Sequence, residues 1–109
     1  MATSLDLLQG TLDLLVLRTL GREAMHGYAV ARLIKERSKH VFLVEEGALY
    51  PALHRLERKG LVEAEWGASE NNRKAKFYQL TAQGRAQLRA ELAEWSRYTK
   101  AVAGVLQLA

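Results

Sequence analysis

The sequence predicts a mainly α-helical fold with one small β-hairpin, followed by a long C-terminal helix. Three observations support this fold class. The first 60 residues contain three segments with apolar side chains at helical spacing. Residues 61–80 then contain two short runs of strand-like pattern around a polar loop, and residues 81–109 return to helical spacing. Because the period of the hydrophobic pattern distinguishes strands from helices, the elements can be assigned in chain order.

The first predicted helix covers residues 5–20 and is apolar on nearly all sides. Leu8, Leu12 and Leu15 form one row at helical spacing, and further leucines cover much of the opposite side. A helix of this kind has to be buried on two sides, which a monomer of 109 residues provides with difficulty. We therefore expect this helix to contribute to a dimer interface.

The second predicted helix covers residues 27–38, with Tyr28, Val30 and Ile34 facing inward and charged side chains facing outward. The connector that follows, residues 39–45, contains an apolar run at residues 41–44. The length of this run fits a brief strand.

The third predicted helix covers residues 46–59 and has two distinct faces. Its buried stripe consists of Leu49, Leu53 and Leu56, and the helix ends before Gly60, a good helix terminator. Pro51 lies near the start, where a missing N–H does least harm. The opposite face presents the polar residues Tyr50, His54 and Arg58, with Arg55 beside them.

A hairpin follows, with strands predicted at residues 61–66 and 74–80 and a loop of turn-forming residues at 67–73. Arg73, Lys74 and Lys76 cluster at one end of the second strand. The last predicted helix opens at the N-cap Thr81 and extends to about residue 108, roughly 40 Å. Its apolar positions have coiled-coil-like spacing and need a partner: Leu88, Leu92, Trp95, Val102 and Leu106.

Three helices followed by a hairpin form a winged helix-turn-helix. We divide the chain into a winged helix-turn-helix domain, residues 1–80, whose first helix also contributes to the dimer, and a dimerisation helix, residues 81–109. In such a module the third helix enters the major groove of DNA and the wing carries cations to phosphates. Winged helices also serve as modules that bind proteins or small molecules without reading DNA, and the net charge of +4 permits nucleic acid without requiring it.

Other classes of function find little support in the sequence. The absence of cysteine excludes disulfides and thiol chemistry and fits a reducing compartment, so we expect a cytoplasmic protein. No stretch approaches 18 uninterrupted apolar residues, so we expect no membrane segment. The three histidines are 14 residues apart on different elements, which is not metal-ligand spacing. No phosphate-binding loop or nucleophile–base pair is recognisable. We therefore expect no metal, no cofactor and no catalytic residues.

Several motifs resemble the PadR family of bacterial transcriptional regulators over essentially the whole chain. The most specific is GALYPALHRLERKGL, residues 47–61, joined by MHGYAVARLIKE at 25–36, RKAKFYQLTAQGRAQL at 73–88 and WSR at 95–97. The lack of a large C-terminal region resembles the subgroup in which one C-terminal helix makes the homodimer. The resemblance implies a dimeric repressor that binds a palindromic operator in double-stranded DNA and is released by a small aromatic or drug-like effector.

The resemblance also assigns roles to individual residues. Tyr50 and the neighbourhood of Arg55 match the family's DNA-facing motif, and Arg73, Lys74 and Lys76 match its basic wing. Trp95 matches a tryptophan that flanks a flat hydrophobic pocket at the dimer centre. From the residues alone, Tyr50 could instead pack beside Pro51, Arg55 and Arg58 could pair with Glu57 and its neighbours, and Trp95 could serve only in dimer packing. Two departures are the wing tip Asn71 and Asn72, where many relatives carry glycines, and the acidic Glu45 and Glu46 before the third helix.

Overall fold

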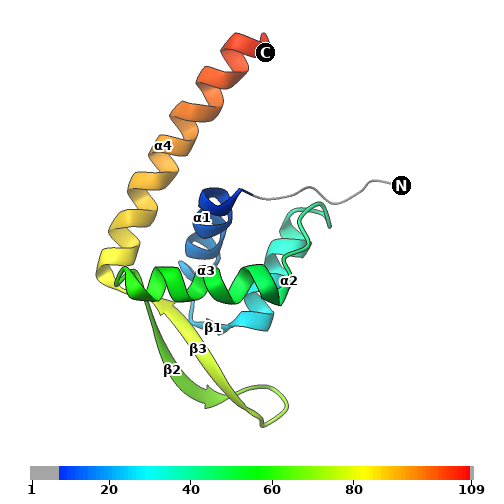
Figure 1. Cartoon of the computed structure of the whole chain (residues 1–109), viewed down its shortest axis with the longest axis vertical. Helices are drawn as coiled ribbons and strands as arrows, with labels where there is room; N and C mark the ends of the chain where they lie inside the picture. Colours follow the sequence, from blue (N-terminus) through cyan, green and yellow to red (C-terminus); the bar gives the residue numbers. More distant parts are fainter. Residues whose placement is uncertain (1–7, 109) are drawn as a thin grey trace.

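The computed structural model describes residues 8–108, and its elements follow the predicted order (Figure 1). They are α1 (Gln9–Leu20), β1 (Met25–His26), α2 (Gly27–Arg37), α3 (Glu46–Arg58), β2 (Val62–Ala68), β3 (Lys74–Leu80) and α4 (Ala82–Leu106). The predicted fold class, a winged helix-turn-helix with a long C-terminal helix, is confirmed. Residues 5–7 of the predicted first helix lie outside the described residues.

The sheet contains one strand that the sequence analysis missed. β1 pairs antiparallel with β3, so the strand order is β1-β3-β2. Met25 lies opposite Tyr78, and His26 lies opposite Phe77. A strand of two residues is too short to produce an alternating pattern, so no periodic signal could have revealed it.

The strand predicted at residues 41–44 is wrong. The chain leaves α2 through Lys39 and His40, both with positive φ, and the His40 N–H donates to the carbonyl of Lys35 at 2.8 Å. Phe42 and Val44 then pack against the core from an irregular connector. The apolar run therefore reflects packing between α2 and α3 and not pairing in a sheet.

The core lies where α1, α2, α3 and the sheet meet. Its most enclosed side chains come from every one of these elements and include Val16, Leu17, Val30, Leu53 and Tyr78. Two predicted interface residues, Leu12 and Leu88, also belong to this core, with exposed fractions of only 5% and 7%. Packing between α1 and the first turns of α4 covers both residues within one chain, which leaves little of either side chain exposed to a partner. Tyr28, predicted to face inward, is instead exposed on α2.

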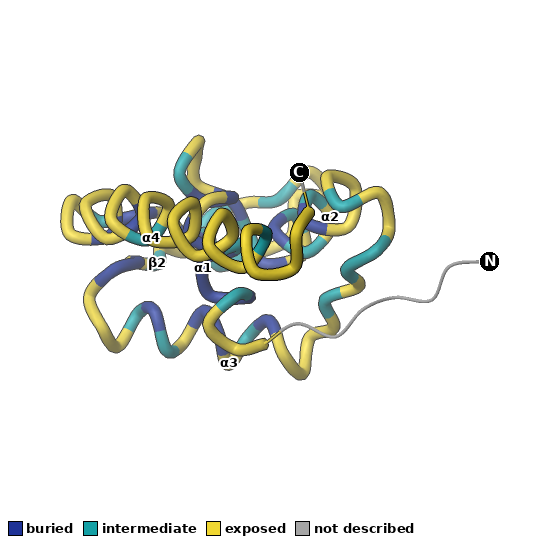
Figure 2. Tube along the Cα trace, turned by 90° about the horizontal axis from the view of Figure 1, so that it is seen from above, coloured by how far each residue is buried: buried dark blue, intermediate teal, exposed yellow. Residues whose placement is uncertain are grey.

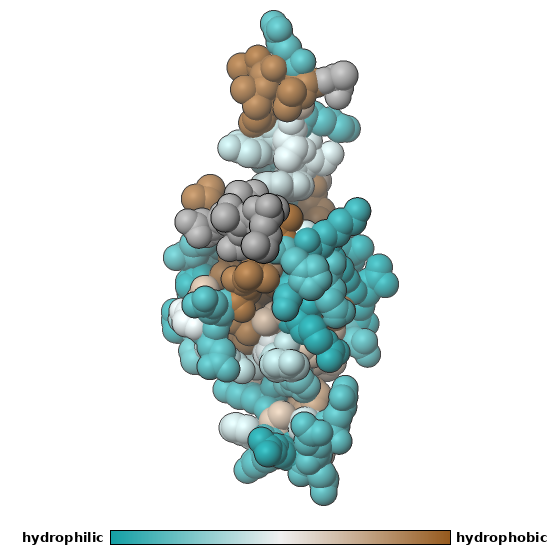
Figure 3. All heavy atoms as spheres, turned by 90° about the vertical axis from the view of Figure 1, so that its right-hand side faces the viewer, coloured by the Kyte–Doolittle hydropathy of each residue, from teal (hydrophilic) through white to brown (hydrophobic). Residues whose placement is uncertain are grey.

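After Leu88, α4 leaves the body of the protein, and nearly all of its later residues are exposed (Figure 2). Figure 3 shows hydrophobic surface at the projecting end, where Val105, Leu106 and Leu108 are exposed. Exposing these apolar side chains to water at the end of an isolated helix costs free energy. An exposed apolar surface of this kind is typical of a surface that another chain covers.

Candidate nucleic-acid interface

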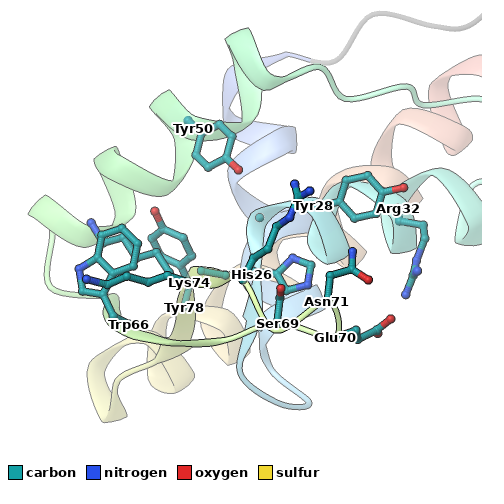
Figure 4. Close-up of a pocket in the computed structure, with 14 residues that line it drawn as sticks. His26, Tyr28, Arg32, Tyr50, Trp66, Ser69, Glu70, Asn71, Lys74 and Tyr78 are labelled. Atoms are coloured by element: carbon teal, nitrogen blue, oxygen red, sulfur yellow. The ribbon is translucent and has the colours of Figure 1, made fainter.

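A hollow of about 680 Å³ lies between the hairpin and the helices α2 and α3 (Figure 4). Tyr50 points into it from α3, while Arg32 and Glu70 lie at one end and Trp66 and Lys74 at the other. Four of the residues predicted to bind DNA line this hollow: Tyr50, Arg73, Lys74 and Lys76. The structure therefore brings residues from α3 and from the wing to one surface.

The exposed face of α3 carries His54 and Arg58, as predicted from the helical spacing. Tyr50 is half-buried, and its ring rests against Gly27 at the start of α2. A Cβ placed on Gly27 would lie 2.9 Å from the Tyr50 hydroxyl oxygen, so a side chain at this position would displace the Tyr50 ring. Tyr50 thus packs against α2 and at the same time borders the hollow.

The start of each helix in the helix-turn-helix unit is held differently. The Nδ1 atom of His26 accepts a hydrogen bond from the Ala29 N–H at 3.2 Å and so caps α2. The α3 helix begins after Glu45, which makes no side-chain cap. The first N–H groups of α3 therefore receive no cap from that side chain.

The three wing cations differ in their surroundings. Arg73 and Lys74 are exposed, and the Lys74 Nζ atom lies 5.1 Å from the centre of the Trp66 ring. Lys76 is less exposed and lies 4.0 Å from the Glu57 carboxylate on α3. Arg73 and Lys74 are therefore the freer charges, since part of the Lys76 charge is offset by Glu57.

The wing tip is a closed turn. The Ser69 N–H donates to the Arg73 carbonyl at 2.8 Å, and the Asn72 N–H donates to the Ser69 carbonyl at 2.9 Å. Asn72 has a φ of +57°, in the left-handed region that glycine and asparagine tolerate best. The asparagine at the tip therefore suits the turn geometry that a glycine would otherwise satisfy.

Arg55 has a partner inside the protein. Its Nη2 atom lies 2.8 Å from the Asp13 Oδ1 atom on α1, and its Nε atom lies 3.4 Å from Oδ2. The guanidinium thus points toward α1, away from the exposed face formed by His54 and Arg58. This arrangement differs from the DNA-facing role that we predict for Arg55 from the sequence.

Tyr78 lies under the hollow and is almost completely buried. Burial raises the pKa of its phenol above the ordinary value of 10.0, and the nearby Glu57 and Tyr50 raise it further. The phenol is therefore neutral at physiological pH and acts as a core side chain beneath the interface.

A second candidate site lies between the start of α1 and the middle of α4. This groove, of about 450 Å³, is lined by Leu8, Gly10, Thr11, Leu14, Glu91, Glu94, Trp95 and Tyr98. The Trp95 and Tyr98 rings lie with centroids 6.1 Å apart. Of the predicted interface residues, Leu8, Leu92, Trp95, Val102 and Leu106 are exposed, whereas Leu15 packs partly against the core.

Sequence reasoning missed most of the other residues that line the hollow, among them the aromatic and basic side chains of His26, Tyr28, Arg32 and Trp66. Alternation along β2 places Trp66 on the same sheet face as the buried Val62. Trp66 is nevertheless 60% exposed, because the core ends before it reaches the tip of the hairpin. The one sequence signal for Trp66 is that it is a large aromatic residue directly before the predicted wing loop.

Comparisons with known proteins agree with this architecture. Residues 16–90 match the model of the Transcriptional regulator PadR-like family. The transcriptional regulator Rv3488 of Mycobacterium tuberculosis is 42% identical over 64 residues, which are 59% of this chain and 56% of the relative. The structure is also similar to that of a PadR family transcriptional regulator from Eggerthella lenta, with a TM-score of 0.74 and 36% identity over 93% of this chain and 86% of that one.

A PadR-like transcriptional regulator from Bacillus cereus has a similar structure as well, with a TM-score of 0.79 and 28% identity. The match covers 93% of this chain and 96% of that one. Within residues 8–108, no helix has both the length and the apolar character needed to cross a membrane.

Proposed function

We propose that this chain, which belongs to the PadR-like family of transcriptional regulators, is a homodimeric cytoplasmic repressor that a small aromatic or hydrophobic effector releases from DNA. The observation that carries the DNA-binding part is the hollow shared by α3 and the hairpin. It brings Tyr50 of α3 and the cations of the projecting wing to one surface.

In this proposal α3 enters the major groove of a palindromic operator. His54 and Arg58 reach base edges or phosphates from its exposed face, and Tyr50 contacts DNA at the rim of the hollow. Arg73 and Lys74 neutralise flanking phosphates, with a smaller contribution from Lys76 because Glu57 shares its charge.

The dimer forms through the projecting part of α4, which leaves residues 1–80 as the DNA-binding domain. The exposed apolar residues of α4 and the exposed Leu8 before α1 need a covering surface, and a second copy of the chain presents the same apolar stripe. The two recognition helices then lie about one DNA turn, roughly 34 Å, apart.

The groove beside Trp95 is the proposed effector site. The rings of Trp95 and Tyr98 and the side chains of Leu8 and Leu14 form an apolar lining suited to a flat aromatic compound. In this proposal the dimer has two conformations, one that binds DNA and one that does not. Release from DNA requires that the effector have the higher affinity for the conformation that does not bind DNA.

Salt dependence of binding to the protein's own promoter DNA tests the DNA-binding role. For a regulator of this kind, the logarithm of the affinity falls linearly with the logarithm of the salt concentration, with a slope of about 0.9 for each phosphate neutralised. Replacing Arg73, Lys74 and Lys76 together with glutamine lowers that slope. A matched control replaces the exposed cations Arg18, Arg22 and Arg89, which lie outside the hollow.

An unchanged slope in the wing variant removes the wing from the proposal. If wild-type protein binds promoter DNA no better than random DNA, the chain is instead a winged-helix module for proteins or small molecules. The effector role is tested by quenching of Trp95 fluorescence with planar aromatic compounds after Trp66 has been replaced by phenylalanine. Equal quenching in a Trp95→Phe variant that keeps Trp66 contradicts the assignment of the groove.

A further inference from the structure

We infer that the ion pair between Asp13 and Arg55 positions the recognition helix, so that Arg55 supports DNA binding through α1 and not through a phosphate contact. This inference rests on the proposed DNA-binding function and concerns the same surface. It gives Arg55 a role that its place on the recognition helix does not suggest.

The Asp13–Arg55 pair is a two-pronged ion pair in a partly buried position. The Arg55 Nη2 group donates to Asp13 Oδ1 at 2.8 Å and the Nε group donates to Oδ2 at 3.4 Å, so each carboxylate oxygen accepts one hydrogen bond. The side chains are only 21% and 12% exposed, and Asp13 is the one charged residue among the buried side chains of the described chain. Such charge-assisted, two-pronged contacts are among the stronger and more directional hydrogen bonds.

The position of Arg55 on α3 gives the contact its effect. Successive helical residues are rotated by about 100° around the axis, so Arg55 lies between the exposed His54 and the buried Leu56. The leucine stripe holds α3 by contacts that have little directional preference. The ion pair adds a directional contact, which fixes how far α3 is rotated about its axis and therefore where His54 and Arg58 point.

Few other polar contacts restrain this helix. Glu45 provides no side-chain cap at its start. Within residues 8–108, the only other ion pair that an α3 side chain makes is between Glu57 and Lys76, at 4.0 Å. The Asp13 contact is thus the shortest polar side-chain link between the recognition helix and the rest of the fold. It joins α3 to α1, the helix whose first turns line the groove beside Trp95.

The two possible roles of Arg55 predict opposite effects of a change at Asp13. If Arg55 is positioned by Asp13, then Asp13→Asn weakens operator binding. If Arg55 contacts a phosphate, removing the competing carboxylate leaves binding unchanged or strengthens it. Glu23→Gln is the matched control, because it removes the same charge from an exposed residue of the loop before β1.

The experiment compares full-length wild type, Asp13→Asn, Arg55→Gln, the double variant and Glu23→Gln in operator binding at several salt concentrations. Circular dichroism identifies a temperature at which every variant is fully folded, and all binding measurements are made at that temperature. We expect each single variant to lose about 10-fold in affinity, as when the binding-competent orientation falls to about a tenth of the population. The double variant loses no more than either single one, and the salt slope stays at the wild-type value.

Two results overturn the inference. One is an affinity in Asp13→Asn equal to or above that of Glu23→Gln. The other is a salt slope in Arg55→Gln that falls by about 0.9 per subunit, which reports a lost phosphate contact.

Hydrogen exchange of the free proteins separates this inference from the proposed function. In Asp13→Asn, we expect the amides of α3 to exchange about 10-fold faster while those of β2 and β3 keep their wild-type rates. Uniformly faster exchange in all elements would assign the pair to general stability. Unchanged exchange in α3 would show that the pair does not hold this helix. Either result refutes positioning. If wild type fails to bind promoter DNA specifically, the proposed function fails, and the exchange rates still decide whether the pair holds α3.

Discussion

Replacing Gly84 with alanine tests how closely α4 must approach the backbone of Leu61, just before β2. Gly84 is buried in the first turns of α4, and a Cβ at this position would overlap the carbonyl oxygen of Leu61 and lie 2.9 Å from its carbonyl carbon. The Leu61 oxygen belongs to the backbone and accepts a hydrogen bond from the Thr81 N–H at 3.1 Å. No side-chain rotation can relieve the overlap, so the start of α4 must move.

The movement disrupts three contributions to stability. The cap from Thr81 Oγ1 to the Gly84 N–H is worth about 1 kcal/mol, and the Thr81–Leu61 hydrogen bond contributes about another 1 kcal/mol. Partial exposure of the buried Leu88 costs about 1 kcal/mol more. The better helix propensity of alanine returns about 1 kcal/mol. The net loss is about 2 kcal/mol, which for a domain of this size lowers Tm by roughly 10 °C.

Urea denaturation followed by circular dichroism measures this loss, with all variants at the same protein concentration because self-association would make stability depend on concentration. Gly47→Ala is the matched control, because nothing lies within 4 Å of a Cβ built on Gly47. It should leave the urea midpoint unchanged or raise it. A midpoint for Gly84→Ala equal to that of the control would refute the argument from the Leu61 carbonyl.

Three further outcomes are expected. Thr81→Ala loses both the hydrogen bond that Oγ1 donates to the Gly60 carbonyl and the cap of Gly84, so the unfolding free energy in urea falls by about 1–2 kcal/mol, whereas Thr81→Ser should retain most of it. The raised pKa of Tyr78 makes its phenol ionise above the ordinary value of 10.0 in an absorbance titration. Because the folded state favours the neutral phenol, stability is retained below about pH 10 and lost as pH rises through the folded-state pKa, a loss that Tyr78→Phe should reduce. Leu92→Glu places a charge on the exposed apolar stripe of α4 and should shift sedimentation at micromolar concentration toward monomer, while an unchanged dimer would place the interface elsewhere.

The helices and the hairpin could be predicted from the sequence because each is encoded by a local period. The stripe of Leu49, Leu53 and Leu56 marks the buried face of α3, and the same spacing correctly places His54 and Arg58 on its exposed face. The cluster from Arg73 to Lys76 likewise follows from its position beside a predicted turn. These features depend on residues that are neighbours in the chain.

The wrong strand at residues 41–44 and the burial of Leu12 and Leu88 within one chain share a different cause. The apolar run at residues 41–44 has the composition of a strand, but its side chains fill the space between α2 and α3 and no partner strand pairs with it. Leu12 and Leu88 fit an intermolecular stripe equally well, yet neighbouring elements of the same chain bury them. The hydrophobic period of a helix or strand identifies its apolar face but does not indicate whether another element of the same chain or a second chain covers that face.

The sequence by itself determined the order of the elements, the exposed face of α3 and the concentration of positive charge in the wing. Only the tertiary structure decided that α3 and the wing border one hollow, that Glu57 shares the charge of Lys76, and that Arg55 turns toward Asp13 on α1. Local patterns are set by the rotation of the backbone from one residue to the next. The partners of Arg55 and Lys76 are 42 and 19 positions away in the chain, so their pairing depends on how whole elements pack.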